Sequence, residues 1–99
     1  MAAHIALHYT EKLRVEDIAK AAGLNPNYAM NLFSRTCGMS LLDYVIQHRL
    51  FHSRRLLATT DAKVIEIALE SGFGSLSRFY EAFQRAYGRS PQAYRRRFA

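Results

Sequence analysis

The sequence predicts an all-α protein of about seven helices, in which two helix-turn-helix subdomains are joined by a long linker helix. No stretch shows the alternation of apolar and polar residues that is typical of a half-buried strand. Residues 41–58 contain neither glycine nor proline, and their apolar residues recur at intervals of three and four. A pattern of residues is repeated on the two sides of this stretch, at an offset of 49 or 50 residues.

The repeat is visible as matching residues in the two halves. Gly23 and Gly72 each lie five residues after the isoleucine of an Ile-Ala pair. A phenylalanine follows ten or eleven residues later, at Phe33 and Phe83, and another glycine comes five residues after each. A repeated supersecondary unit explains these matches.

Helices before the long one start and stop at recognisable residues. Gly23 and Gly38 follow the second and third helices, and glycine is favoured just past a helix end. Asn25 is a cap for the third helix, and Pro26 suits its first position. These helices are expected over residues 4–9, 15–22 and 26–36, with Ile5, Ala6, Leu7, Val15, Ile18, Ala19, Ala22, Ala29, Leu32 and Phe33 available for burial.

The long helix is expected over residues 41–58. Ser40 is its cap, and Asp43 is an acidic near-match to the second residue of a capping box. Its length would be about 25 Å, at about 1.5 Å per residue. Its inward face is expected to carry Leu42, Val45, Ile46, Leu50, Ser53, Leu56 and Leu57.

The second half repeats these signals. Ser75 caps one helix, Gly88 ends it, and Ser90 with Pro91 opens a short last helix. These helices are expected over residues 64–71, 76–87 and from 91 onward, buried through Val64, Ile67, Ala68, Phe79, Ala82, Phe83 and Ala86, with Tyr94 and Phe98 as apolar residues of the last one.

Composition indicates one small domain of 99 residues with 14 Lys and Arg, 8 Asp and Glu, and a net charge of +6. Most of these basic residues are arginines, whose guanidinium groups suit phosphate groups and base edges. Cys37 is the single cysteine, so no internal disulfide is possible. No apolar run is long enough for a membrane span, and the N-terminus lacks a signal-peptide pattern. We expect a cytoplasmic protein that binds no membrane.

Catalytic and metal-binding patterns are missing from the sequence. His4 and His8, like His48 and His52, are four residues apart, but no third ligand is placed nearby. No glycine-rich phosphate loop or catalytic triad is present. We therefore expect no enzymatic activity, no cofactor and no metal. Residues expected in the core or in packing are Tyr28, Tyr44, Phe73, Phe79, Phe83, Tyr87, Tyr94 and Cys37, whereas Arg95, Arg96 and Arg97 are expected at a solvated or phosphate-facing helix end.

The chain resembles the DNA-binding domain of AraC/XylS-type transcription regulators over nearly its whole length. The first half matches through IAKAAGLNPNYAMNLFSRTCGMSLLDYV. The second half matches through IEIALESGFGSLSRFYEAFQRAYGRSPQAYRR, which carries the more specific motifs. The resemblance implies a sequence-specific activator or repressor that works with RNA polymerase. It also implies a separate effector-binding or dimerisation domain, which this chain lacks, so the isolated domain is expected to be monomeric.

Base-reading residues follow from the outward faces of the two second helices and, independently, from the resemblance. Such a helix fits the major groove of double-stranded DNA. An Asn pairs with adenine, an Arg with guanine, a Glu with cytosine, and an apolar side chain contacts the thymine methyl group. Glu81 has the alternative role of holding Arg78. The expected base readers are Asn27, Met30, Asn31, Leu76, Ser77, Arg78 and Glu81.

Phosphate contacts are expected from a wider set of polar and basic residues. Arg14 and Lys63 occupy equivalent repeat positions where a Ser or Thr cap would be usual. A cation there opposes the helix dipole, and a neighbouring phosphate would offset that cost. The expected contacts are Arg14, Ser34, Arg35, Arg54, Arg55, Lys63, Gln84 and Arg85.

The predicted division is a single DNA-binding domain over 1–99, with units at 1–40 and 59–99 and the linker helix at 41–58. Recognition helices on one face of DNA must lie about 34 Å apart, which a stiff spacer could provide. Two alternatives stay open: a helix-turn-helix module that binds proteins, and a basic surface that binds membranes or RNA without specificity.

Overall fold

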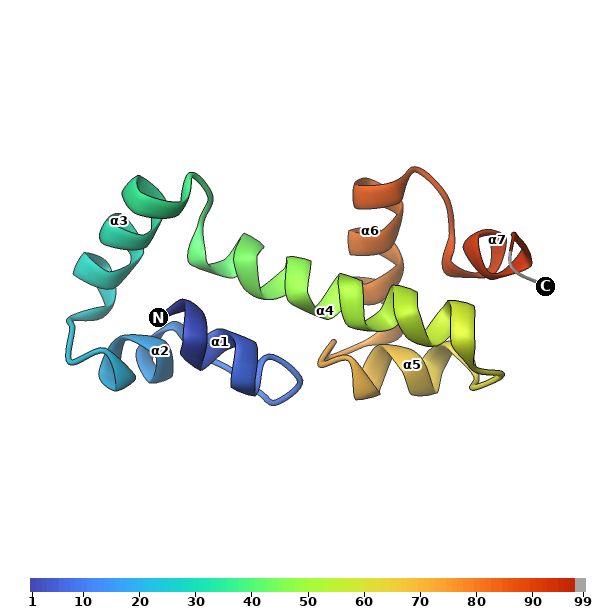
Figure 1. Ribbon diagram of the computed structural model, residues 1–99, viewed down its shortest axis with the longest axis horizontal. Helices are drawn as coiled ribbons and strands as arrows, with labels where there is room; N and C mark the ends of the chain where they lie inside the picture. The colour runs from blue at the N-terminus through green and yellow to red at the C-terminus, as the bar shows by residue number, and fades with distance from the viewer. Residues whose placement is uncertain (98–99) are drawn as a thin grey trace. The chain divides into compact units, whose positions relative to one another are not determined.

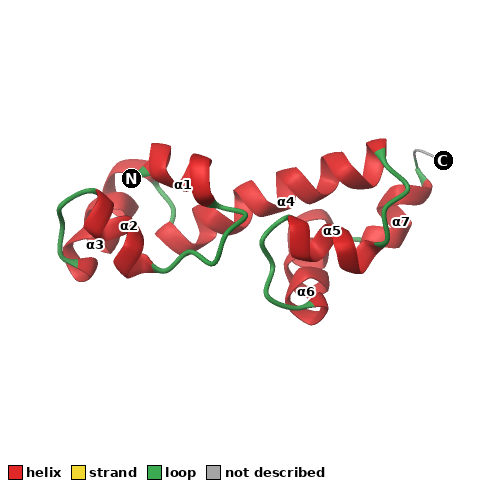
Figure 2. Ribbon diagram, turned by 90° about the horizontal axis from the view of Figure 1, so that it is seen from below, coloured by secondary structure: helices red, strands yellow, loops and turns green. Residues whose placement is uncertain are grey.

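The computed structural model describes residues 1–97 (Figure 1). Within that part of the chain seven helices and no strand occur (Figure 2), as the sequence predicts. Helix ends differ from the predicted ones by at most two residues. The helices are α1 (Ala2–His8), α2 (Val15–Ala21), α3 (Pro26–Cys37), α4 (Leu41–Thr59), α5 (Val64–Glu70), α6 (Leu76–Tyr87) and α7 (Pro91–Arg96).

Two compact units divide the chain, Met1–His48 and Arg49–Ala99, and the boundary falls within α4. Each unit contains one helix-turn-helix pair, α2 with α3 in the first and α5 with α6 in the second. No helix over residues 1–97 is long and apolar enough to cross a membrane.

The turn inside each pair is a Schellman motif, which explains the two matching glycines. In the first unit the Leu24 N–H donates to the carbonyl of Ala19 at 2.8 Å, and Gly23 has a φ of 69°. In the second unit the Phe73 N–H donates to the carbonyl of Ala68 at 3.0 Å. Glycine adopts this left-handed conformation without a side-chain clash, so the same turn forms twice.

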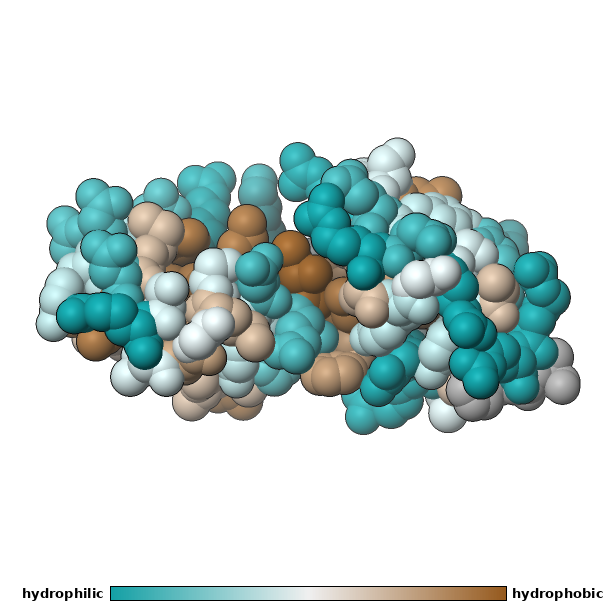
Figure 3. Space-filling view, turned by 90° about the horizontal axis from the view of Figure 1, so that it is seen from above, coloured by the Kyte–Doolittle hydropathy of each residue, from teal (hydrophilic) through white to brown (hydrophobic). Residues whose placement is uncertain are grey.

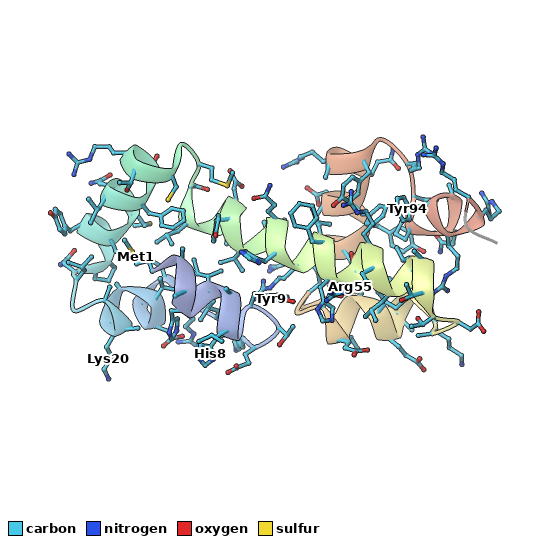
Figure 4. The ribbon with its side chains drawn as sticks, in the orientation of Figure 1. Met1, His8, Tyr9, Lys20, Arg55 and Tyr94 are labelled. Atoms are coloured by element: carbon cyan, nitrogen blue, oxygen red, sulfur yellow. The ribbon has the colours of Figure 1, made fainter. Side chains whose placement is uncertain are left out.

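The first unit has a core formed around α1, α2, α3 and the start of α4. Ile5, Ala29 and Phe33 are almost inaccessible to solvent. Tyr9, labelled in Figure 4, follows α1. Its ring centroid lies 5.3 Å from that of His48. The remaining core residues are Ile18, Ala19, Leu41 and Val45.

Aromatic rings dominate the core of the second unit. Phe83 is fully buried, with ring centroids 5.6 Å from Phe79, 4.7 Å from Tyr87 and 5.6 Å from Tyr94. Tyr94 comes from α7 (Figure 4), so this helix packs on α6 through the ring cluster. Edge-on aromatic pairs of this kind add about 0.5–1.5 kcal/mol each beyond their burial.

Arg95 was predicted at a solvated or phosphate-facing helix end, but its guanidinium binds backbone carbonyls instead. Its Nε donates to the carbonyl of Leu57 at 3.2 Å, and a terminal nitrogen donates to the carbonyl of Thr60 at 3.2 Å. These carbonyls lie at the C-terminal end of α4, where a helix leaves its last acceptors unsatisfied and favours a cation. Phe98 lies outside the described residues.

Several residues predicted to be buried are exposed instead. Leu7 is 77% exposed and Leu42 is 60% exposed, whereas Leu41 is buried. Helical spacing does not decide which of two adjacent leucines faces inward, because the neighbouring elements set the phase of the face. Tyr28 is 52% exposed, and the others that are wrong in the same sense are Ala6, Ala22, Cys37 and Ala86.

Candidate nucleic-acid interface

Helix α3 presents polar side chains away from the core of the first unit. The side chain of Asn25 starts the helix by accepting the Asn27 N–H at 2.9 Å. Ala29 and Phe33 are buried, so at about 100° per residue the opposite face is centred on Asn31. Exposed residues of this face and its edges are Asn27, Tyr28, Met30, Asn31, Ser34 and Arg35.

Helix α6 has the same construction in the second unit. The Ser75 hydroxyl accepts the Arg78 N–H at 3.2 Å, and Phe79 and Phe83 face the core. Tyr80, at one edge, is half-buried and accepts a hydrogen bond from the Gln92 side chain. The exposed residues of the outward face are Ser77, Arg78, Glu81, Gln84 and Arg85.

Six of the seven predicted base readers are therefore solvent-exposed on α3 or α6. Met30 is 40% exposed and lies at the edge of its face. Leu76 is half-buried at the first position of α6, next to the buried side. Tyr28, expected in the core because it is aromatic, is also exposed on α3. The repeat aligns Tyr28 with Arg78 and could have indicated this exposure.

Glu81 pairs with Arg85, whereas the alternative role predicted for it was an ion pair with Arg78. The Arg85 guanidinium donates to a carboxylate oxygen of Glu81 at 3.4 Å. These side chains are 81% and 72% exposed respectively, so water screens the pair, and it contributes little to stability. Spacings of three and four are both compatible with a helix, and side-chain conformation selects between them.

The predicted phosphate contacts are exposed with one exception. Arg54 is half-buried, and its guanidinium lies 5.1 Å from the ring centroids of Phe51 and Tyr87. Burial raises the pKa of Tyr87, whereas the charge of Arg54 acts in the opposite direction. The exposed ones are Arg14, Ser34, Arg35, Arg55 (Figure 4), Lys63, Gln84 and Arg85.

Arg14 and Lys63 stand directly before α2 and α5, as the sequence predicts. Neither side chain caps its helix, since neither can accept a hydrogen bond. Instead the N–H of Arg14 donates to Asp17 at 3.1 Å, and the N–H of Lys63 donates to Glu66 at 3.4 Å. Each acid also lies at the positive end of its helix, where a negative charge is favoured. The side chains of Arg14 and Lys63 are exposed to solvent.

Hydrophilic side chains, teal in Figure 3, lie on the visible surface of both units.

Arg49 of α4 lies in the sequence between the candidate residues of α3 and those of α6. It is half-buried, and desolvation lowers the pKa of its guanidinium. The rings of His4 and His8 lie 4.5 Å apart. Over residues 1–97 no three His, Cys, Asp or Glu side chains are grouped so that they could hold a metal ion.

Two units, each with a capped second helix whose outward face is polar, define a double helix-turn-helix protein. The family model of a helix-turn-helix domain matches residues 18–97. The chain therefore belongs to the AraC-type helix-turn-helix family of DNA-binding domains from transcription regulators.

Curated relatives agree with this assignment. The melibiose operon regulatory protein of Escherichia coli K12 is 42% identical over 96 residues, which are 97% of this chain and 32% of that protein. Regulatory protein PocR of Salmonella typhimurium is 35% identical over 93% of this chain and 30% of its own length. The chain thus spans about a third of the length of these relatives.

Solved structures agree as well. The C-terminal domain of AraT, a response regulator from Geobacillus stearothermophilus, is 28% identical with a TM-score of 0.91 over 96% of this chain and 79% of that one. The DNA-binding domain of AdpA, a global transcriptional factor solved with a target DNA, is 31% identical. Its TM-score is 0.90 over 98% of this chain and 91% of that one.

Proposed function

We propose that this chain binds double-stranded DNA sequence-specifically, with α3 and α6 as the recognition helices. The observation that carries the proposal is the duplication of one arrangement: a side-chain cap, a buried face that includes a phenylalanine, and an exposed polar face. A helix with a polar outward face fits the major groove, and its N-terminal residues reach the base edges. Both arrays of candidate readers begin within two residues of a cap.

Base readout is assigned by chemistry to the residues on the outward faces. Asn27 and Asn31 suit adenine, and Met30 suits the methyl group of thymine. In α6, Arg78 suits guanine and Glu81 suits cytosine, with Ser77 beside them. Leu76 is half-buried at the first position of the helix, next to the buried side, and is assigned an apolar contact with a thymine methyl group. The exposure of Arg78 and the pairing of Glu81 with Arg85 support this, because no ion pair has to break before Arg78 reaches a base.

Phosphate contacts are assigned to Ser34, Arg35, Gln84 and Arg85 at the sides of the recognition helices, and to Arg54 and Arg55 of α4. Arg54 would contribute its stacked guanidinium, which the rings of Phe51 and Tyr87 orient. Contacts of this kind supply affinity for any sequence and position the recognition helices.

Arg14 and Lys63 are proposed as a matched pair of phosphate contacts, one per unit. Their exposure, and the acids that satisfy their backbone N–H groups, leave both cations available. Changing both residues to Ala should flatten the slope of log affinity against log salt by about two. If affinity and slope both stayed unchanged in a salt titration, these cations would have no such contact.

One chain is further proposed to occupy two successive major grooves. The uninterrupted helix α4, Leu41–Thr59, supports this, because at about 1.5 Å per residue it is about 28 Å long and adjacent major grooves repeat at about 34 Å. We also propose that residues 1–99 act as a single DNA-binding domain. In this domain the linker helix joins two helix-turn-helix units.

The complete regulator is proposed to control transcription in the cytoplasm together with RNA polymerase. Because the chain spans about a third of its curated relatives, an effector-binding or dimerisation domain would lie elsewhere, and the isolated chain is expected to be a monomer. No catalytic activity is proposed, since the relatives are regulatory proteins.

Selection of binding sites from a random duplex pool tests the function. The proposal predicts an enriched site with two blocks of preferred bases about 10 base pairs apart, and affinity that falls steeply with added salt. One block would mean that a single groove is read. An unenriched pool, or binding to scrambled duplex with equal affinity, would contradict sequence-specific function.

A further inference from the structure

Tyr28 and Arg78 occupy the same position in the two recognition helices. The side chain of Asn25 accepts the Tyr28 N–H at 3.4 Å, and the side chain of Ser75 accepts the Arg78 N–H at 3.2 Å. Each is therefore the third residue after its cap. The next residue, Ala29 or Phe79, is fully buried, so the two helices share one register as well as one cap.

Exposure separates Tyr28 from the core aromatic residues of the chain. Its side chain is 52% exposed, whereas Phe33, five residues further along α3, is 2% exposed. At about 100° per residue, Tyr28 lies on the same side of the helix as Asn31 and Arg35. An exposed ring there adds apolar contact area to the side of α3 that carries amide groups.

The outward faces of the two helices consequently differ in chemistry. Before Arg35, α3 presents two amides, a phenol ring, a thioether and the hydroxyl of Ser34, all uncharged. The corresponding part of α6 presents Arg78 and Glu81. Asn pairs with adenine and apolar side chains contact the thymine methyl group, whereas Arg pairs with guanine and Glu accepts from cytosine.

We propose that Tyr28 is a base-reading residue and that the two helices read different half-sites. α3 reads an A·T-rich block, with the Tyr28 ring against a thymine methyl group and Asn27 and Asn31 on adenine. α6 reads a block that contains guanine, through Arg78. This rests on the proposed function, and it specifies which class of base pairs each recognition helix takes.

The test compares sites selected from a random duplex pool by the 99-residue chain and by variants of Tyr28. Unmodified protein should enrich an A·T-rich block and a guanine-containing block. Tyr28→Ala should lose the thymine preference at one or two base pairs of the A·T block, by about fivefold or more, and leave the guanine block unchanged. Tyr28→Phe should keep the preference, because the ring supplies the contact.

Exchange of the equivalent residues makes the test directional. Tyr28→Arg should introduce a guanine preference into the former A·T block, and Arg78→Ala should relax only the other block. Leu42→Ala is the matched control, since Leu42 is 60% exposed but belongs to α4. Far-UV circular dichroism checks that each variant is folded.

Outcomes that overturn this inference differ from those that overturn the proposed function. A specific site that Tyr28→Ala binds with unchanged base preferences would show that Tyr28 reads nothing. Equal weakening on selected and scrambled duplex would make Tyr28 a phosphate contact instead. Two blocks of the same base composition would refute the chemical division between the helices. Failure of the unmodified protein to enrich any site would refute the proposed function itself.

Discussion

Removal of the Arg78 side chain should weaken binding to the selected site without a matching loss on other DNA. Arg78 is exposed on α6, and the nearby carboxylate of Glu81 pairs with Arg85 at 3.4 Å. Because Glu81 pairs with Arg85, the Arg78 guanidinium is available to make both hydrogen bonds to guanine. Arg78→Ala removes both of them. A bidentate contact of this kind discriminates between bases by about 1–3 kcal/mol, which corresponds to about five- to 150-fold in affinity.

Arg35→Ala is the matched variant for a phosphate contact. Arg35 occupies on α3 the position that Arg85 occupies on α6, and it too is exposed. Loss of one phosphate contact lowers the slope of log affinity against log salt by about 0.9, so the loss of affinity between about 50 and 200 mM salt becomes about three- to fourfold smaller. This change should be the same on every duplex.

Fluorescence anisotropy with the selected duplex and a scrambled duplex, each over a salt series, measures both effects. Arg78→Ala should reduce the ratio of specific to scrambled affinity, and Arg35→Ala should leave that ratio unchanged. The division into base readers and phosphate contacts is wrong if the two variants change the ratio equally.

Other expectations concern the scaffold and its charges. Phe83→Ala should destabilise the protein by about 3–5 kcal/mol in urea titrations, because it leaves a cavity in the ring cluster, whereas Phe51→Ala, at a half-exposed residue, should cost about 1 kcal/mol. Equal losses would contradict the core described for the second unit. Glu81→Gln should strengthen binding to scrambled duplex, since it removes a negative charge and releases Arg85, and should relax the preference at the base pair that Glu81 reads, with a stability loss of about 0.3–0.5 kcal/mol; unchanged affinity on scrambled duplex would argue against it. Burial raises the pKa of Tyr87 above its ordinary value of 10.0, so its contribution to stability is complete below that pH and is lost as the pH rises through the folded-state pKa. Tyr87→Phe should flatten the decline in stability at alkaline pH, and an identical decline would exclude this origin.

Local interactions explain why so much of the architecture was predictable. Asn25 and Ser75 act as caps, and the residues after Gly23 and Gly72 close identical turns. Caps and left-handed glycines depend on a few neighbouring residues, so they can be recognised in a sequence. The outward faces of α3 and α6 followed from the same local periodicity, because Phe33 and Phe83 had to face a core.

Interactions between elements were not predictable in this way. Leu41 rather than Leu42 is buried because the helices beside α4 set the phase of its inward face. Arg95 binds carbonyls at the end of α4, 35 and 38 residues away, a contact with no local signature.

Sequence alone therefore predicted about seven helices, their ends to within two residues, the two turns and the family. Tertiary structure decided that Tyr28 is exposed, that Glu81 pairs with Arg85, and that the Arg54 guanidinium lies 5.1 Å from the centroids of two aromatic rings. The physical reason is that helix ends depend on hydrogen bonds within a few residues, whereas burial and side-chain pairing depend on groups that only folding brings together.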